Sequence, residues 1–427
     1  MALAAASASV ERMTQNLRVN EAPRGITIAT ALAGALATTL FATTLGAQQM
    51  RSDIPVNAFA RPSGPYAVGM FDTLLVDASR PERYTKNPDD KRKLPVRIWY
   101  PAETVPNATL APYVLRPEEF APNSPMQSLL HVRTNSVVGA PVAKAERRYP
   151  VLIYNHGAGQ PRFSATFVTE FLASYGYVVV AIDHPGMDQT VLFSDGSPFR
   201  PDTLRVPPPD PSADARASLA RQNDFLNTVA FPMWIEDSRF VLDQVEAMNR
   251  APGPLQGRLD LDRIGAFGWS MGGAAALELL RVDPRVKVAV NHDGRLFGSV
   301  MSEPIKRPFM MFHHGINDLS QAPEAVRDAA RENLANIFGL DSAAHRRATA
   351  DWYDVTIART NHGHFSDLPL FMTLFKDTTL LAGPRDHEII TAYTLAFFER
   401  YFRGKQSDLL AKPSPKFPEV TFSRSGR

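Results

Sequence analysis

The order of hydrophobic and polar positions divides the chain near Tyr149. Before this residue, the run from Gly64 to Val76 has a Gly/Pro entry and the run from Leu94 to Pro101 alternates, so both predict strands. We expect the two strands to pair antiparallel, joined by a charged loop from Arg80 to Lys93. Residues 102–147 are mixed and rich in proline, and they predict a surface excursion.

After Tyr149 the pattern changes to apolar runs that alternate with helical segments, which is typical of strands buried on both faces of a parallel sheet. The predicted strands cover residues 151–157, 177–183, 264–267, 286–293, 308–315 and 353–358. The predicted helices cover residues 165–175, 234–248, 274–280, 322–337 and 388–402. The sequence therefore predicts an α/β fold, a mostly parallel central sheet with helices on both faces, in one domain over residues 64–403.

Two segments interrupt or follow this pattern. Residues 185–231 contain the run Pro207-Pro-Pro-Asp-Pro211, which favours a stiff, extended backbone, so we expect an inserted loop that forms a lid or pocket wall. Residues 404–427 are basic and contain proline, and they predict a loosely held tail.

The N-terminal segment has the pattern of an export signal. An uncharged run from Gly25 to Met50 follows three arginines and reaches small residues at Ala47, so residues 1–47 predict a signal peptide cleaved after Ala47. Residues 48–63 are then a spacer, and the protein is expected in the periplasm or outside the cell. The alternative is an uncleaved anchor in the inner membrane, because the apolar run is long enough to span a bilayer.

Composition narrows the chemistry. A net charge of +2 over 427 residues gives no basic groove, so no nucleic-acid partner is expected. The chain contains no cysteine. This absence excludes disulfides, a thiolate nucleophile and cysteine-ligated metal centres.

The strongest chemical motif is Gly268-x-Ser270-x-Gly272, which lies between a predicted strand and a predicted helix. In this setting the pattern is that of a nucleophile elbow, where a serine is held in a strained turn with its hydroxyl clear of the sheet. The alternative is that the glycines only serve a tight turn between strand and helix. The strand and helix on either side favour the nucleophile.

A serine nucleophile needs a base and an acid. The histidines that follow Ser270 are His292, His313, His314, His345, His362, His364 and His387. Only His362 and His364 lie in the loop after the last predicted strand, where the base is expected. Two aspartates compete for the acid, because Asp293 ends the strand after the elbow helix and Asp318 follows the next strand; their positions leave both open.

The developing negative charge requires two backbone N–H donors. Met271, directly after the nucleophile, provides one, and the turn His156-Gly-Ala-Gly159 provides the other, from Ala158. This chemistry requires no metal ion and no organic cofactor.

Several motifs together resemble the platelet-activating factor acetylhydrolase family of α/β-hydrolases, the plasma or isoform II type with its bacterial members, over residues 62–403. They are Gly64-Pro-Tyr-x-Val-Gly69, Arg97-x-x-Tyr-Pro101, His156-Gly-x-Gly159, Gly268-x-Ser-x-Gly-Gly273, Asp293 and His362-x-x-Phe-x-Asp367. Trp269 departs from the pattern, since histidine is common there, and so do the proline-rich insertion and the loop that carries Asp318.

The resemblance implies a fold, an activity and site residues. It implies the α/β-hydrolase fold, Asp293 as the acid, His362 as the base, and Ala158 and Met271 as the oxyanion pair. It also implies a serine esterase that acts on short or oxidised acyl esters of phospholipids, and thus transient contact with a lipid surface. A broad carboxylesterase, lipase or polyester hydrolase is the alternative activity, and a catalytically silent binding protein is the alternative of another class.

Overall fold

The computed structural model describes residues 51, 53–120, 122, 124–186, 199, 215–315, 324–372, 380–381 and 383–426. The predicted signal peptide or anchor lies outside these residues. Among the described helices, none has both the length and the apolar character that a membrane crossing requires.

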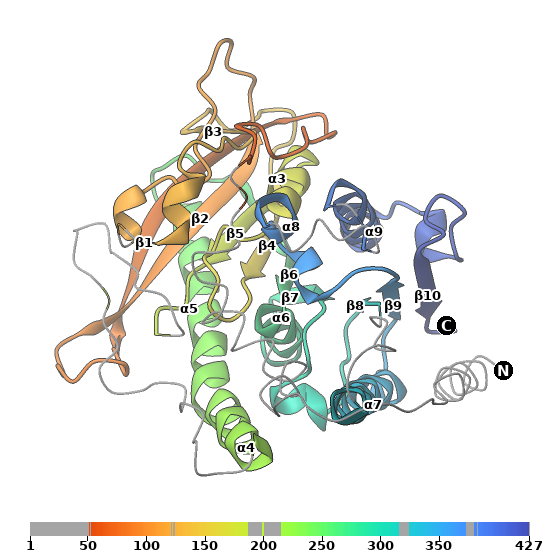
Figure 1. Cartoon of the computed structure of the whole chain (residues 1–427). Helices are drawn as coiled ribbons and strands as arrows, with labels where there is room; N and C mark the ends of the chain where they lie inside the picture. The colour runs from red at the N-terminus through yellow and green to blue at the C-terminus, as the bar shows by residue number, and fades with distance from the viewer. Residues whose placement is uncertain are drawn as a thin grey trace.

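One ten-stranded sheet runs through the described part of the chain, in the order β10-β9-β8-β7-β6-β4-β5-β2-β1-β3 (Figure 1). The strands are β1 Ala67–Pro81, β2 Lys91–Ala102, β3 Ser136–Val138, β4 Tyr149–Asn155, β5 Val178–Ile182, β6 Leu259–Trp269, β7 Val286–His292, β8 Phe309–His314, β9 Trp352–Ile357 and β10 Val420–Arg424. Strands β5, β4, β6, β7, β8 and β9 run parallel. Strand β2 pairs antiparallel with β1, as the sequence predicted.

Helices cover both faces of the sheet, so the predicted α/β architecture is confirmed. The helices are α3 Thr166–Ser174, α4 Ala215–Phe225, α5 Phe231–Arg250, α6 Met271–Val282, α7 Glu324–Arg347, α8 Leu368–Phe371 and α9 Gly383–Arg403. Helices α3 and α9 pack on one face, through side chains such as Leu172 and Phe397. Helices α5, α6 and α7 pack on the other face, through side chains such as Leu242, Leu280 and Ala344.

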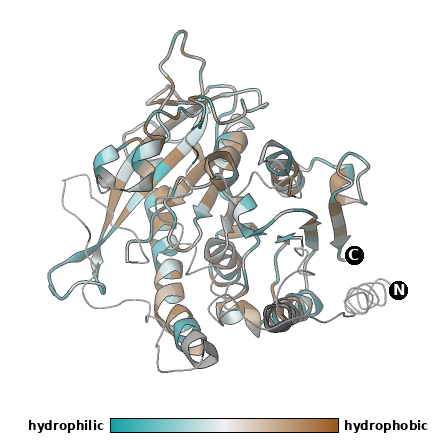
Figure 2. Cartoon of the chain, in the orientation of Figure 1, coloured by the Kyte–Doolittle hydropathy of each residue, from teal (hydrophilic) through white to brown (hydrophobic). Residues whose placement is uncertain are grey.

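Burial of the central strands follows from their composition. All five residues of Val178–Ile182 are apolar and buried, as expected for a strand covered on both faces. Figure 2 shows the contrast between these apolar strands and the hydrophilic loop that connects β1 to β2. That loop is shorter than predicted, because β1 continues to Pro81 and β2 already begins at Lys91.

The tail departs from the prediction of a loosely held segment. Val420–Arg424 forms β10, which pairs antiparallel with β9 and is an edge strand of the sheet. Its Val-Thr-Phe sequence suits a strand, and Val420 is buried against the core. The basic and proline residues around it concealed this short strand.

The insertion is partly described. Its last residues form α4 and a π-helical segment, η4 Leu226–Ala230, that continue directly into α5. The stretch that contains Pro207 to Pro211 lies outside the described residues, and the lid formed by the insertion stays a prediction. Helix α7 extends ten residues beyond the predicted end, to Arg347.

Candidate active site

Ser270 occupies a strained turn between β6 and α6. Its backbone angles are φ 57° and ψ −125°, a left-handed value that a non-glycine residue rarely adopts. A side chain at Gly268 or Gly272 would collide with the backbone of Asn155, at the end of β4, so both positions require glycine. The sequence folds here as an elbow because only these small residues allow the helix to approach the neighbouring strand so closely.

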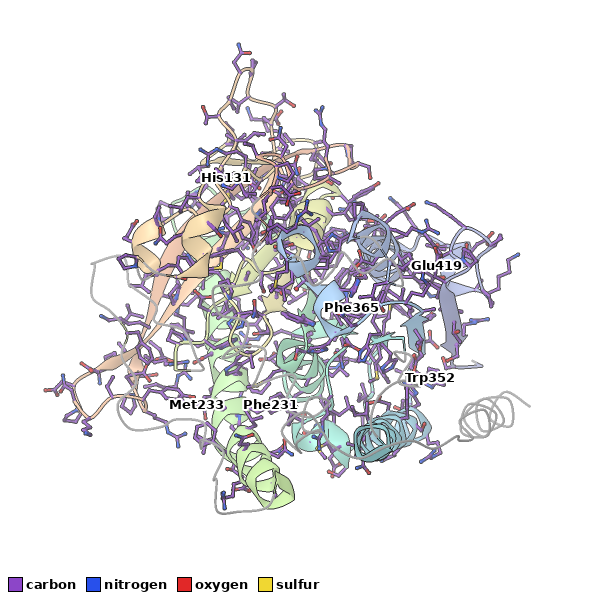
Figure 3. The ribbon with its side chains drawn as sticks, in the orientation of Figure 1. His131, Phe231, Met233, Trp352, Phe365 and Glu419 are labelled. Atoms are coloured by element: carbon purple, nitrogen blue, oxygen red, sulfur yellow. The ribbon has the colours of Figure 1, made fainter. Side chains whose placement is uncertain are left out.

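His362 approaches Ser270 from the loop after β9. Its Nε2 lies 2.9 Å from the Ser270 Oγ. The loop continues as the short helix η6 His362–Phe365, whose first turn is fixed because the Asn361 side chain accepts from Gly363 N–H (3.0 Å). Figure 3 labels Phe365, the last residue of η6, near the middle of the molecule. Trp269 Nε1–H also donates to the His362 carbonyl (2.9 Å), so the residue before the nucleophile holds the loop.

Asp293, the first residue after β7, contacts the opposite side of the His362 imidazole, so Ser270, His362 and Asp293 form a line of three hydrogen-bonded side chains. His362 Nδ1–H donates to Asp293 Oδ2 at 2.6 Å. Burial raises the pKa of the Asp293 carboxyl, but the charge of His314 and the hydrogen bonds from His314 and His362 outweigh it and hold this pKa well below its usual range. The carboxylate is therefore ionised at neutral pH.

The structure thus brings Ser270, Asp293 and His362 together. Asp318, the other aspartate, lies outside the described residues. His364 points elsewhere: its Nδ1 lies near Asn361, and its Nε2 is 3.3 Å from the Leu381 carbonyl.

A second imidazole, that of His314 at the end of β8, also contacts the acid. His314 Nδ1–H donates to Asp293 Oδ2 (2.7 Å), and its backbone N–H donates to Oδ1 (2.9 Å). Burial lowers the pKa of His314, but the charge and hydrogen bond of Asp293 outweigh it and raise this pKa. Sequence reasoning set His314 aside in favour of the loop histidines, although it lies at the same carboxyl edge of the sheet that pointed to Asp293.

Asp293, His314 and His362 are the group of potential metal ligands within the described residues, with ligand atoms within 4.8 Å of one another. Both imidazoles direct an Nδ1–H at the same carboxylate oxygen, at 2.6 and 2.7 Å. These are the lengths of charge-assisted hydrogen bonds. The geometry therefore fits two N–H donors on one ionised carboxylate.

The two predicted oxyanion donors lie beside the elbow. Met271 is the first residue of α6, where backbone N–H groups lack intrahelical acceptors. Ala158 belongs to the turn after β4, residues 156–160, which we call the oxyanion turn. Ala158 packs against the apolar cluster that contains Met271, and a side chain at Gly157 would collide with the Trp269 ring.

Comparison with known proteins agrees with this architecture. Residues 151–420 match the model of the alpha/beta hydrolase family, and residues 54–193 match that of platelet-activating factor acetylhydrolase, isoform II. A ferulic acid esterase from Streptomyces cinnamoneus has a similar solved structure, with a TM-score of 0.65 and 28% identity over 86% of this chain and 99% of that one.

Two curated relatives are similar in sequence. A probable 1-alkyl-2-acetylglycerophosphocholine esterase of Arthroderma benhamiae is 26% identical over 64% of this chain and 66% of the relative. A platelet-activating factor acetylhydrolase of Cavia porcellus is 22% identical over 62% of this chain and 64% of the relative. The match thus spans just under two thirds of each relative. With the alpha/beta hydrolase model matched over more than half of its length, the chain belongs to the alpha/beta hydrolase family.

Proposed function

We propose that the protein is a serine carboxylic-ester hydrolase that works through an acyl-enzyme. The observation that carries this proposal is the line of hydrogen bonds from Ser270 Oγ to His362 Nε2 (2.9 Å) and from His362 Nδ1 to Asp293 (2.6 Å). A serine hydroxyl becomes a nucleophile when a base removes its proton, and a carboxylate orients that base. The activities named for the two relatives and for the similar structure, all on esters, support the same class.

Each group has a role in the reaction. His362 Nε2 takes the proton of Ser270 as Oγ attacks the ester carbonyl, and the N–H groups of Ala158 and Met271 donate to the oxyanion. The His362 imidazolium then protonates the departing alcohol and leaves the acyl group on Ser270. A water molecule repeats the attack, with His362 as its base, and releases the acid. Asp293 orients Nδ1–H and stabilises the imidazolium in both halves.

The substrate we favour is a short or oxidised acyl ester of a phospholipid, because one curated relative is named an acetylglycerophosphocholine esterase and the other an acetylhydrolase of platelet-activating factor. Such a substrate implies transient contact with a lipid surface. The similarity to a ferulic acid esterase favours, as the second candidate, a broader carboxylesterase that also accepts aryl esters. A lipase or polyester hydrolase would instead prefer long-chain or polymeric esters.

Replacing the nucleophile tests the class of activity. Ser270→Ala is expected to lower kcat by at least about 10⁴-fold, because the covalent step is lost while the fold remains. Ser302→Ala, at an exposed serine, is the matched control and should behave as the wild type. A fluorophosphonate probe should add one adduct to the wild type and none to Ser270→Ala.

The outcomes separate the alternatives. If the wild type neither hydrolyses esters nor takes up the probe, the chain is a catalytically silent hydrolase-fold binding protein. Acetyl-glycerophosphocholine, a chain-length series of aryl esters and methyl ferulate distinguish the substrate classes. A preference for methyl ferulate over the acetyl phospholipid would replace the favoured substrate by the second candidate.

Export is part of the proposal. The mature protein is expected to begin at Gln48, after cleavage at Ala47. N-terminal sequencing of protein from the periplasm or the medium checks this. Intact N-termini in the membrane fraction would instead indicate the anchor.

A further inference from the structure

His156, the first residue after β4, has an imidazole with partners on both sides. Its Nε2 lies 3.3 Å from the backbone N of His184, and its Nδ1 lies 2.7 Å from the Gly157 carbonyl oxygen. The side chain is buried, with the Trp234 ring packed edge-on against it at 4.9 Å between centroids. Neither partner belongs to the serine, histidine and aspartate line described above.

These contacts fix the tautomer. A backbone N–H can only donate, so Nε2 must be the acceptor and the single proton of a neutral ring is on Nδ1. Burial, with the neighbouring His184 as the second cause, lowers the pKa of His156 to about 4, so the ring is neutral at pH 7. Nδ1–H therefore donates to the Gly157 carbonyl.

The Gly157 carbonyl also accepts from the backbone N–H of Gln160, at 3.0 Å. Two donors thus fix the plane of the peptide unit between Gly157 and Ala158. This peptide is trans, and in a trans peptide the N–H points opposite to the C=O. Holding the carbonyl toward His156 therefore holds the Ala158 N–H in the opposite direction.

We propose that His156 is a positioning residue for the oxyanion hole: its Nδ1–H holds the Gly157 carbonyl so that the Ala158 N–H is aimed at the negatively charged oxygen of the tetrahedral intermediate. The inference rests on the proposed ester hydrolysis, since only that reaction generates this oxygen. Both ring nitrogens of His156 are engaged with backbone groups, so His156 acts through the peptide unit that it holds.

A buried hydrogen-bond network fixes the position of His184, whose backbone N–H donates to His156 Nε2. The His184 side chain contacts Asp237 (2.9 Å) through Nδ1 and Asn155 (2.8 Å) through Nε2. Arg92 makes a paired contact with Asp237, at 2.6 and 3.1 Å. The backbone N–H of His184 is thereby fixed where it meets His156 Nε2, so the ring cannot rotate without losing both of its bonds.

Two replacements of His156 separate its two bonds. In His156→Asn the side-chain N–H₂ takes the place of Nδ1–H and keeps the donor to Gly157. In His156→Gln the longer amide reaches the Nε2 position, so it keeps the acceptor for His184 N–H and loses the donor to Gly157. Only the second change is expected to release the peptide unit.

His156→Gln should lower kcat by about 30-fold, less than the 10²–10³ for full loss of an oxyanion donor because the Gln160 bond remains. KM should change by less than about threefold, because the donor acts only in the transition state. The Ki of a trifluoromethyl ketone, which forms a charged tetrahedral adduct, should rise in parallel with the loss in kcat. His156→Asn should keep kcat within about fivefold of the wild type.

His131→Gln is the matched control, because the His131 imidazole also lies near a backbone carbonyl (2.9 Å) yet is labelled well apart from Phe365 in Figure 3. The positioning role of His156 is refuted if His156→Gln keeps the wild-type kcat, or if its kcat/KM falls only because KM rises. It is also refuted if His156→Asn and His156→Gln lose the same fraction of kcat. Should His156→Gln fail to fold, a 30-fold loss in folded His156→Asn refutes it as well. A wild type without esterase activity would instead reject the proposed function.

Discussion

Two turns meet at the active edge of the sheet, and different forces hold them. The elbow after β6 is held by its own backbone, since Gly268 and Gly272 allow close contact and Ser270 N–H donates to the His292 carbonyl of β7 (3.0 Å). The oxyanion turn after β4 has one backbone bond, from Gln160 N–H to the Gly157 carbonyl (3.0 Å), but it also depends on side chains. His156 contacts it directly, and Asp237 acts from helix α5 through His184.

The difference follows from what each turn must do. The elbow must hold the Ser270 residue in a strained conformation. Close backbone contacts at Gly268 and Gly272, where no Cβ atom fits, keep it there. The oxyanion turn must aim a backbone N–H, and its glycines, with Gly159 at φ 73°, leave several conformations open. Hydrogen bonds from distant residues are needed to select one of them.

The largest effect is expected where the elbow meets its acid. Asp293→Asn should lower kcat by about 10³–10⁴-fold, because an amide no longer holds the His362 tautomer that accepts the serine proton. Asp318→Asn is the control and should retain activity. A severe loss in Asp318→Asn with a mild one in Asp293→Asn, measured with an aryl ester, would move the acid to Asp318.

A large loss of stability is expected under the oxyanion turn. Asp237→Asn should lower the free energy of unfolding by about 3 kcal/mol, because the buried Arg92 guanidinium loses its paired contact with Asp237, although Glu82 (3.0 Å) still partly compensates its charge. Asp243→Asn lies on the same helix with a largely exposed carboxylate, and it should lose at most about 1 kcal/mol. Urea unfolding of both variants measures the contrast.

The contribution of Asp237 to the free energy of unfolding should decrease as the pH falls. Burial raises the pKa of Asp237, but the Arg92 charge and the hydrogen bonds from His184 and Arg92 hold it well below its usual range. Its stabilisation is thus complete above the unfolded pKa of about 4 and is lost as the pH falls below it. The stability gap between the wild type and Asp237→Asn should narrow as the pH falls from about 5 to 3; a constant gap would contradict this origin.

The contrast also explains what the sequence could predict. The β-α-β alternation predicted the sheet, and Gly268-x-Ser270-x-Gly272 predicted the elbow, because both depend on residues close together in the chain. Arg92 and Asp237 are 145 positions apart, and no local pattern marks them as partners. His314 was missed because its role depends on the packing of β7 against β8, and β10 was missed because it is a short strand within a basic tail.

A third change tests whether the elbow is held by exclusion. Gly272→Ala places a Cβ against the Asn155 backbone, where neither partner can yield, so it should destabilise the protein by about 3 kcal/mol. Gly339→Ala, inside α7 with no atom within 4 Å of the added Cβ, should stabilise it by roughly 0.5–1 kcal/mol. Thermal melting of both variants and the wild type measures these changes. If Gly272→Ala melted at the same temperature as the wild type, the elbow would not need a glycine at this position.

The smallest effect is expected at His314, a distant side chain that contacts the acid beside the elbow. His314→Gln removes one of two imidazoles on Asp293, while the His314 backbone N–H and His362 keep their bonds, so kcat should fall only about threefold. Because Asp293 raises the pKa of His314, its stabilisation is complete below the unfolded pKa of about 6.5 and is lost as the pH rises.

The stability gap between the wild type and His314→Gln should therefore be about 1 kcal/mol at pH 5.5 and should shrink toward pH 9. Unfolding at the two pH values measures it, with His131→Gln as the control. The activity assay then bears on the comparison of the two turns. If His314→Gln lost as much kcat as His156→Gln, the elbow would depend on distant side chains as strongly as the oxyanion turn does, and local exclusion would no longer distinguish them.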